Sequence, residues 1–274
     1  MRRLPLVLLL ACTALALSAT AASAAFNGMA AKRWAAKIAA VGPRPAGGAN
    51  EKAAGRVVRS RLKHLGYDVS TQHVPLPEGS RSLNVVGRTP GPVRVVLVAH
   101  VDGVPGTLAA NDNGSGVGLM LMLAQYLRNE NGVLVAAVGA EERRYTGAGY
   151  HLGSRRLARS LTPAERQGVR LALSLDMVAV GPTLNIRGLE SSPNRSARRV
   201  LAAARQLGIR ASYLEDTGQS DHDEFVAVGV PAAWVQWRWD PCWHEPCDRT
   251  SRLRAPKLGA AGHIVRRAAL NALG

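Results

Sequence analysis

The sequence has few cysteines, few aromatic residues and few acidic residues. Its 274 residues include three Cys and two Phe, and 19 Asp and Glu stand against 35 Lys and Arg, for a formal net charge of +16. Such a charge raises the question of nucleic-acid binding. The basic residues are spread over several helical stretches, however, and aromatic residues that could stack on bases are not interleaved with them. We therefore expect solvated basic helix faces, no nucleic-acid partner, and only loose attraction to anionic polymers.

An apolar stretch near the N-terminus is too short to span a membrane. Residues 4–17 are largely apolar, follow a positively charged start and precede Ala22-Ser23-Ala24, which has the pattern of a cleavage site. Polar residues interrupt the stretch before the roughly 20 apolar residues that a spanning helix needs. We expect residues 1–24 to be a signal peptide and residues 25–274 to be one exported domain without a stable membrane anchor. Lipoprotein anchoring at Cys12 is disfavoured, because the apolar stretch continues past it.

The other two cysteines, Cys242 and Cys247, flank His244. In an oxidising compartment a lone close pair is expected to form a disulfide. This bond would rigidify the turn that presents His244. The alternative is a structural zinc ion bound by Cys242, His244 and Cys247, but a fourth ligand is lacking nearby. Both interpretations stay open on the sequence alone.

Four apolar runs each lead to residues that can bind a metal ion. Near-continuous Val, Leu and Ala runs are typical of parallel strands buried on both faces. Ligands bind beyond the carboxyl ends of such strands. We therefore expect one edge of one sheet to collect the residues that follow the runs 93–99, 133–140, 171–175 and 231–237, namely His100, the pair Glu141 and Glu142, Asp176, and His244.

Strand and helix patterns alternate along the chain. Such alternation predicts an α/β fold, with a single-domain, mostly parallel mixed sheet and helices on both faces. The sequence shows neither repeats nor a linker between domains. The expected helices are 29–41, 50–65, 116–128, 148–159, 194–207 and 256–272. The expected strands are 67–74, 83–87, 93–100, 133–140, 171–176, 183–187, 211–214 and 231–237.

Each candidate ligand is a weak signal when taken singly. His100 could be an ordinary histidine at a strand end, and the segment from Asn111 to Gly116 could be a turn with a helix cap. These alternative explanations give no reason for all the candidates to follow separate strands. Histidine and carboxylate ligands without thiolates suit zinc, and also manganese or cobalt.

The order of these motifs resembles that of the secreted co-catalytic di-zinc aminopeptidases, relatives of bacterial leucyl aminopeptidase and glutamate carboxypeptidase. The resemblance covers about residues 41–253 and implies a zinc exopeptidase fold, two Zn²⁺ ions and peptide substrates. The motifs that carry it are Ala99-His100-Val101-Asp102, Ala110-Asn111-Asp112-Asn113-Gly114-Ser115-Gly116, Glu141-Glu142, Leu175-Asp176-Met177, Ser220-Asp221-His222 and His244-Glu245-Pro246-Cys247-Asp248.

The resemblance implies a role for each ligand. Asp112 would bridge two zinc ions, with His100 and Asp176 completing one site and Glu142 and His244 completing the other. No thiolate takes part in either set.

Two further residues would act beside the metals. Asp102 would accept the free ring N–H of His100 and fix its tautomer, while Glu141 would be the general base. The resemblance also implies a cis peptide bond between Asp112 and Asn113, for which residues 114–116 offer a permissive backbone.

The sequence departs from the family in two places. Trp243 precedes the last histidine where relatives often carry Tyr, and an indole can donate one hydrogen bond but has no acidic proton. Residues 143–148 replace a more usual Gly-Leu-x-Gly-Ser run near the expected entrance, so substrate preference is not carried over. Asp221 and His222 are expected to support the site structurally rather than contact substrate.

Several functions share this fold, and an aminopeptidase is favoured. A glutaminyl cyclase, an acyltransferase with one zinc, is disfavoured because both ligand sets are intact. A carboxypeptidase is a further alternative. A non-catalytic binding module would lack ligands or the base, which are all present here. The segment between Asp176 and His244 leaves no room for the lid domain of more distant metallopeptidases.

Overall fold

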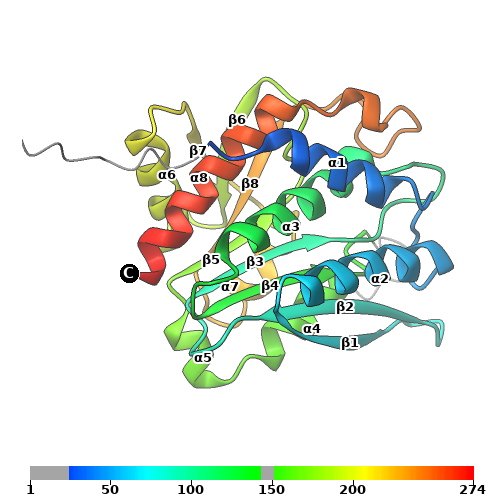
Figure 1. Cartoon of the computed structure of the whole chain (residues 1–274), viewed down its shortest axis with the longest axis horizontal. Coiled ribbons are helices and arrows are strands. Elements are labelled where there is room, and N and C mark those ends of the chain that lie inside the picture. Colours follow the sequence, from blue (N-terminus) through cyan, green and yellow to red (C-terminus); the bar gives the residue numbers. More distant parts are fainter. Residues whose placement is uncertain (1–24, 143–150) are drawn as a thin grey trace, which may run out of the picture.

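Eight strands form one mixed sheet in the computed structural model, which describes residues 25–142 and 151–274 (Figure 1). The order across the sheet is β1-β2-β4-β3-β5-β8-β6-β7. The strands are β1 (Asp68–Pro75), β2 (Arg81–Arg88), β3 (Val95–His100), β4 (Val133–Val138), β5 (Leu171–Leu175), β6 (Thr183–Gly188), β7 (Ser212–Glu215) and β8 (Ala232–Arg238).

The centre of the sheet is parallel and its flanks are partly antiparallel. β3 pairs in parallel with β4 and β5, and β5 pairs in parallel with β8. β6 and β7 are parallel to each other, whereas β1 with β2, β2 with β4 and β6 with β8 are antiparallel. This confirms the predicted mostly parallel mixed sheet. All residues of β3, β4 and β5 are buried, as their unbroken apolar runs predicted.

Alternate residues of the central strands face two separate cores. In β3, Val95, Leu97 and Ala99 join the core under one layer of helices, while Val96 and Val98 join the core on the opposite face. The first layer consists of α1 (Gly28–Ala39), α2 (Ala49–His64), α3 (Gly116–Leu127), α6 (Arg195–Gln206) and α8 (Ala255–Leu273). The second core contains residues of α4 (Leu152–Ser160) and α7 (His222–Val226). Helices on both faces are thus confirmed.

The structure differs from the prediction at short helices. α5 (Pro163–Gly168) and α7 have six and five residues, too few to produce a clear apolar period. The sequence did contain a signal for α5, because Thr162 and Glu165 form a capping box around a proline in the first turn. The helix expected over 148–159 begins at Leu152 in the described part, and residues 143–150 lie outside it.

Among the described residues, no helix combines the length and apolar character needed to cross a membrane.

Close packing of α1 against α3 positions the turn from which α3 begins. This turn, η1 (Ala110–Ser115), leads directly into α3. Gly118 in α3 faces the backbone of α1, where an added Cβ would lie 2.5 Å from the carbonyl oxygen of Ala31 and 2.6 Å from the nitrogen of Ala35. A glycine is therefore required for this helix contact.

We expect Gly118→Ala to lower the free energy of unfolding by about 1–3 kcal/mol, because the added methyl group forces two buried helices apart. Gly259→Ala is the matched control, since Gly259 also lies inside a helix and its added Cβ would meet nothing closer than 3.8 Å. That variant should gain up to about 1 kcal/mol from helix propensity. Urea unfolding measures both. Equal stability of Gly118→Ala and the wild type would contradict the close contact.

Candidate metal centre

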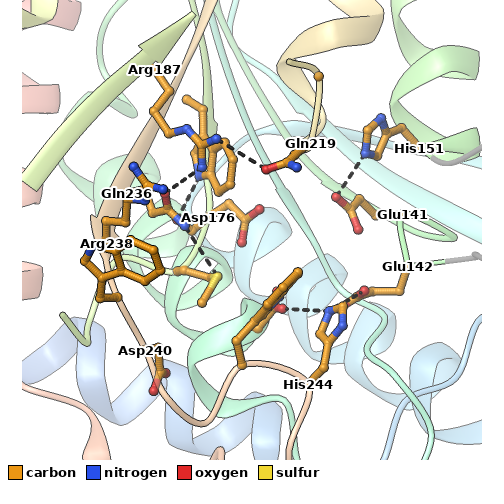
Figure 2. Close-up of a pocket in the computed structure, with 16 residues that line it drawn as sticks. Glu141, Glu142, His151, Asp176, Arg187, Gln219, Gln236, Arg238, Asp240 and His244 are labelled. Carbon is orange, nitrogen blue, oxygen red and sulfur yellow. Dashed lines mark hydrogen bonds and ion pairs between the residues drawn. The ribbon is translucent and has the colours of Figure 1, made fainter. Parts of the chain in front are cut away.

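Parallel strands bring the predicted residues to one edge of the sheet. His100 is the last residue of β3, Glu141 and Glu142 follow β4, and Asp176 directly follows β5. His244 lies in the loop after β8. Because β3, β4, β5 and β8 run in the same direction, their carboxyl ends meet at this edge. Figure 2 shows Glu141, Glu142, Asp176 and His244 around one pocket.

The carboxylate of Asp112 lies between the two imidazoles. Its Oδ1 is 3.2 Å from Nε2 of His100, and its Oδ2 is 3.2 Å from Nε2 of His244. Each imidazole nitrogen also faces a second carboxylate. Oδ1 of Asp176 is 3.5 Å from His100 Nε2, and Oε2 of Glu142 is 2.8 Å from His244 Nε2. The five predicted ligands thus form two sets that share Asp112.

Several of these atoms fit a metal ion better than a hydrogen-bonded network. Nε2 of His100, Oε1 of Glu142 and Oδ1 of Asp176 are buried without a hydrogen-bond partner in the described part of the chain. Such orphaned polar atoms are rare and point to an ion or a water. Imidazole and carboxylate donors without thiolates suit zinc.

The potential ligands also form two overlapping triplets. Atoms of His100, Asp112 and Glu142 lie within 4.8 Å of one another, as do those of His100, Glu141 and Asp176. Grouping by distance alone places Glu142 with His100, whereas direct contact pairs it with His244 at 2.8 Å. The direct contact assigns Glu142 to the set of His244. Glu141 is close enough to the metal centre to act on a group bound there.

The clustered carboxylates require compensating positive charge. Burial disfavours the charged imidazoles, but the neighbouring Asp112 and Glu142 raise the pKa of His244 to about 10. Burial likewise opposes the charged form of His100, yet Glu141, Asp112 and Asp176 hold its pKa well above the usual range. Burial raises the pKa of both Glu141 and Glu142 well above that of a free glutamate. Protons or metal ions can supply the missing charge.

Asp102 holds the backbone that presents the two glutamates. Its Oδ1 accepts a hydrogen bond from the N–H of Glu141 at 3.2 Å, and its Oδ2 accepts one from Glu142 at 3.1 Å. The resemblance implied a hydrogen bond from the free ring N–H of His100 to Asp102, but Nδ1 of His100 lies 3.7 Å from Oδ1 of Asp102, which is longer than a hydrogen bond. Sequence reasoning missed the role of Asp102 in fixing the turn after β4.

Asp248 and Ser220, both buried, hold the Asp112 turn and Asp176 in place. Asp248 accepts hydrogen bonds from the N–H groups of Asn111 and Asp112 at 2.7 and 3.0 Å. Ser220 donates to Oδ2 of Asp176 at 2.8 Å, leaving Oδ1 facing His100. Each interaction fixes the orientation of a carboxylate that the sequence placed only at a strand end or in a turn.

Unusual backbone conformations concentrate around the site. The peptide bond between Asp112 and Asn113 is cis, as the resemblance implied. Non-glycine residues with positive φ in the described chain are Ala109, Ala140, His151, Met177, Trp239 and His244. All of them border or belong to the segments that form the site. Left-handed backbone is unfavourable for such residues and is often found where side chains are aimed at a functional site.

The turn that presents His244 is closed by a disulfide between Cys242 and Cys247. This confirms the predicted bond and excludes the alternative structural zinc site, because both sulfur atoms are used. Trp243 packs on the imidazole of His244, with ring centroids 4.3 Å apart, and remains 48% exposed at the pocket.

The pocket also contains residues that the sequence did not single out. It has a volume of about 360 Å³, within the range of ligand sites. His151 faces the base candidate, with its Nε2 3.3 Å from Oε1 of Glu141, and Arg187 and Arg238 line the other side (Figure 2). The sequence around these three residues carries no motif that predicts a site. They reach the pocket only because the fold brings distant segments together.

Asp221 and His222 are buried and do not line the pocket. His222 contacts Asp216 and Asp223, each at 3.2 Å. This placement agrees with a structural role. The entrance segment predicted over 143–148 lies outside the described residues.

The fold and the site together define an α/β metallopeptidase architecture. The sequence model described as Peptidase family M28 matches residues 84–269, and the chain belongs to this family.

Its relatives include aminopeptidases. The chain is 29% identical to Aminopeptidase YwaD of Bacillus subtilis, over 65% of this chain and 41% of that protein. It is 31% identical to a Probable lipoprotein aminopeptidase LpqL of Mycobacterium tuberculosis, over 75% of this chain and 50% of that protein. The chain thus spans about two-fifths to half the length of these curated relatives.

Solved structures support the fold. BSAP, a zinc aminopeptidase from Bacillus subtilis, superimposes with a TM-score of 0.83 at 20% identity, covering 90% of this chain and 95% of that one. A glutaminyl cyclase from Porphyromonas gingivalis gives 0.79 at 24% identity, covering 90% and 98%. At such identities the likeness shows a shared fold and does not choose between the two activities.

Proposed function

We propose that this chain is a zinc-dependent exopeptidase, and specifically an aminopeptidase that removes N-terminal residues from peptides. The observation that carries the proposal is the placement of Asp112 between His100 and His244, with one carboxylate oxygen toward each. Membership of a peptidase family and the names of two relatives support the same activity.

The cofactor in this proposal is a pair of Zn²⁺ ions. Asp112 would bridge them, His100 and Asp176 would hold one, and Glu142 and His244 would hold the other. When bound, the ions lower the pKa of water and polarise the scissile carbonyl group.

The residues of the chain perform the remaining steps. Glu141 accepts a proton from the attacking water and returns it to the leaving amine. Asp102 fixes the backbone of Glu141 and Glu142, so that one carboxylate can bind metal while the other moves a proton. Trp243 can supply an indole N–H to the carbonyl oxygen of the substrate.

A glutaminyl cyclase is the second candidate, because structural neighbours of that name share the fold. The positions of the candidate ligands argue for the peptidase, because side chains suited to two metals meet at the site. A carboxypeptidase would use the same centre on the other end of a peptide. A binding module without activity has the least support, because it would have no use for the base Glu141.

We further propose that residues 1–24 are a signal peptide and that residues 25–274 form the exopeptidase domain, which acts outside the cytoplasm. The disulfide between Cys242 and Cys247 supports an oxidising compartment. The relative LpqL is named a lipoprotein aminopeptidase, so anchoring through Cys12 is the alternative.

We expect the purified protein to contain close to two equivalents of zinc, because the ligands form two sets around Asp112. Chelation should abolish activity, and Zn²⁺ or Co²⁺ should restore it. Elemental analysis alongside a peptidase assay measures both. Full activity with a single equivalent would contradict the two-metal proposal and favour the cyclase.

The adjacent glutamates should respond differently to removal of their charge. Glu141→Gln should lower kcat by roughly 10²- to 10⁴-fold, the range expected for loss of a general base, while metal content stays unchanged. Glu142→Gln is the matched variant and should lower metal occupancy at one site. Near-normal turnover by Glu141→Gln would show that another residue is the base.

A free amino terminus should be required in the substrate. Carboxylates beside the metals can hold the ammonium group, and N-acetylation removes its charge. We expect an acetylated peptide to be cleaved far more slowly than its free counterpart, as measured by release of the first residue. Equal cleavage would rule out an aminopeptidase but leave a metal-dependent hydrolase. Release of the last residue instead would indicate a carboxypeptidase.

A further inference from the structure

The pocket carries opposite charges on its two sides. Glu141, Glu142 and His244 lie on one side, and Arg187 and Arg238 lie on the other (Figure 2). The two arginines come from neighbouring antiparallel strands, Arg187 near the end of β6 and Arg238 at the end of β8. A substrate spanning the pocket would therefore meet carboxylates at one end and guanidinium groups at the other.

Arg187 is already neutralised by its surroundings. Its Nη2 is 3.2 Å from Oδ1 of Asp216, and its Nη1 donates a hydrogen bond to Gln236 at 2.9 Å. The guanidinium also lies over the ring of Trp234, 4.0 Å from its centroid, and the residue is 7% exposed. These contacts make Arg187 a fixed part of the wall.

Arg238 differs because no carboxylate in residues 25–142 and 151–274 lies within ion-pair distance of it. The nearby Asp240 is occupied, since it accepts hydrogen bonds from Asn111, from the N–H of Cys242 and from Arg252. Oδ2 of Asp176 accepts one from Ser220. Among the described residues, the guanidinium of Arg238 therefore lies in the pocket without a carboxylate paired to it.

An aromatic ring supports this guanidinium. Arg238 lies 4.4 Å from the ring centroid of Trp239, which also lines the pocket and is 68% exposed. Stacking against the ring limits the movement of the side chain while leaving its N–H donors available. A planar fork of donors held in this way suits a carboxylate, which it can bind through two parallel hydrogen bonds.

We propose that Arg238, supported by Trp239, binds a carboxylate of the substrate at the side of the pocket opposite Glu141 and Glu142. The inference rests on the proposed aminopeptidase function and specifies its substrate class, namely short peptides that carry a carboxylate beyond the cleaved bond. The ammonium group would face the acidic side and the carboxylate would face Arg238. The carboxylate could come from a free C-terminus or from an acidic side chain.

Two matched pairs of peptides test the inference and separate these sources. Leu-Ala and Leu-Ala-NH₂ differ in the C-terminal carboxylate, whereas Leu-Asp-NH₂ and Leu-Asn-NH₂ differ in an acidic side chain. In one pair, the wild type should show a kcat/KM at least about tenfold higher for the carboxylate peptide than for its neutral partner. One charge-assisted hydrogen bond is strong enough to produce a ratio of this size. The pair that shows the preference identifies the source.

Arg238→Gln should bring that ratio to about one, and Arg238→Lys should keep part of it. Arg210→Gln removes the same charge from an exposed position outside the pocket and should leave the ratio unchanged. If the wild type shows no preference in either pair, or if Arg238→Gln keeps the preference, the inference is overturned while the aminopeptidase function stands.

A binding measurement keeps the inference testable if no peptide is cleaved. Calorimetry with Glu141→Gln protein should show tighter binding of the carboxylate peptide, and the added Arg238→Gln substitution should abolish the difference. Absence of cleavage by the wild type would contradict the proposed function. In that case, tighter binding of the carboxylate peptide that is lost in Arg238→Gln would support the carboxylate site. Equal binding of the two peptides would overturn it.

Discussion

The carboxylate of Asp112 has to lie between two imidazoles, and much of the surrounding structure holds it there. Asp248 accepts hydrogen bonds from the backbone on the N-terminal side of this residue, and Asn113 is tied to the end of β5 through a bond from its side-chain nitrogen to the Leu175 carbonyl. Gly116 lies so close to that same carbonyl that a Cβ would clash with it at 1.9 Å. The bridging position therefore depends on a turn packed directly against a central strand.

The carboxylates gathered at this edge of the sheet repel one another, and the positive charge of a buried arginine partly offsets this repulsion. Arg44 is fully buried and donates hydrogen bonds of 2.8 Å to the carbonyl oxygens of Val101, Leu108 and Ala109. Burial lowers its pKa to about 10, while Asp102 and other nearby carboxylates favour its charged form. Arg44 thus fixes the loop between β3 and the Asp112 turn and adds positive charge behind the metal centre.

The sequence predicted the sheet and the ligands because both follow local patterns. Buried parallel strands produce unbroken apolar runs, so the ends of the runs located His100 and Asp176 within a residue. Contacts between distant segments leave no such pattern. Asp102 was placed beside His100, yet its two hydrogen bonds go to the turn after β4. His151 has a left-handed backbone and directly precedes α4, a conformation that the apolar periodicity did not indicate. Its position beside Glu141 depends on this conformation.

Charge on this molecule acts at two length scales. The chain as a whole is strongly basic, so its field attracts molecules that carry carboxylates, whereas the metal centre is locally acidic and attracts cations. The field of the whole surface is screened within about 8 Å at physiological salt, but contacts inside a partly enclosed pocket are screened much less. The basic surface therefore affects how fast an anionic peptide arrives. The orientation of a bound peptide depends instead on the short distances inside the pocket, around Glu141 and Arg238.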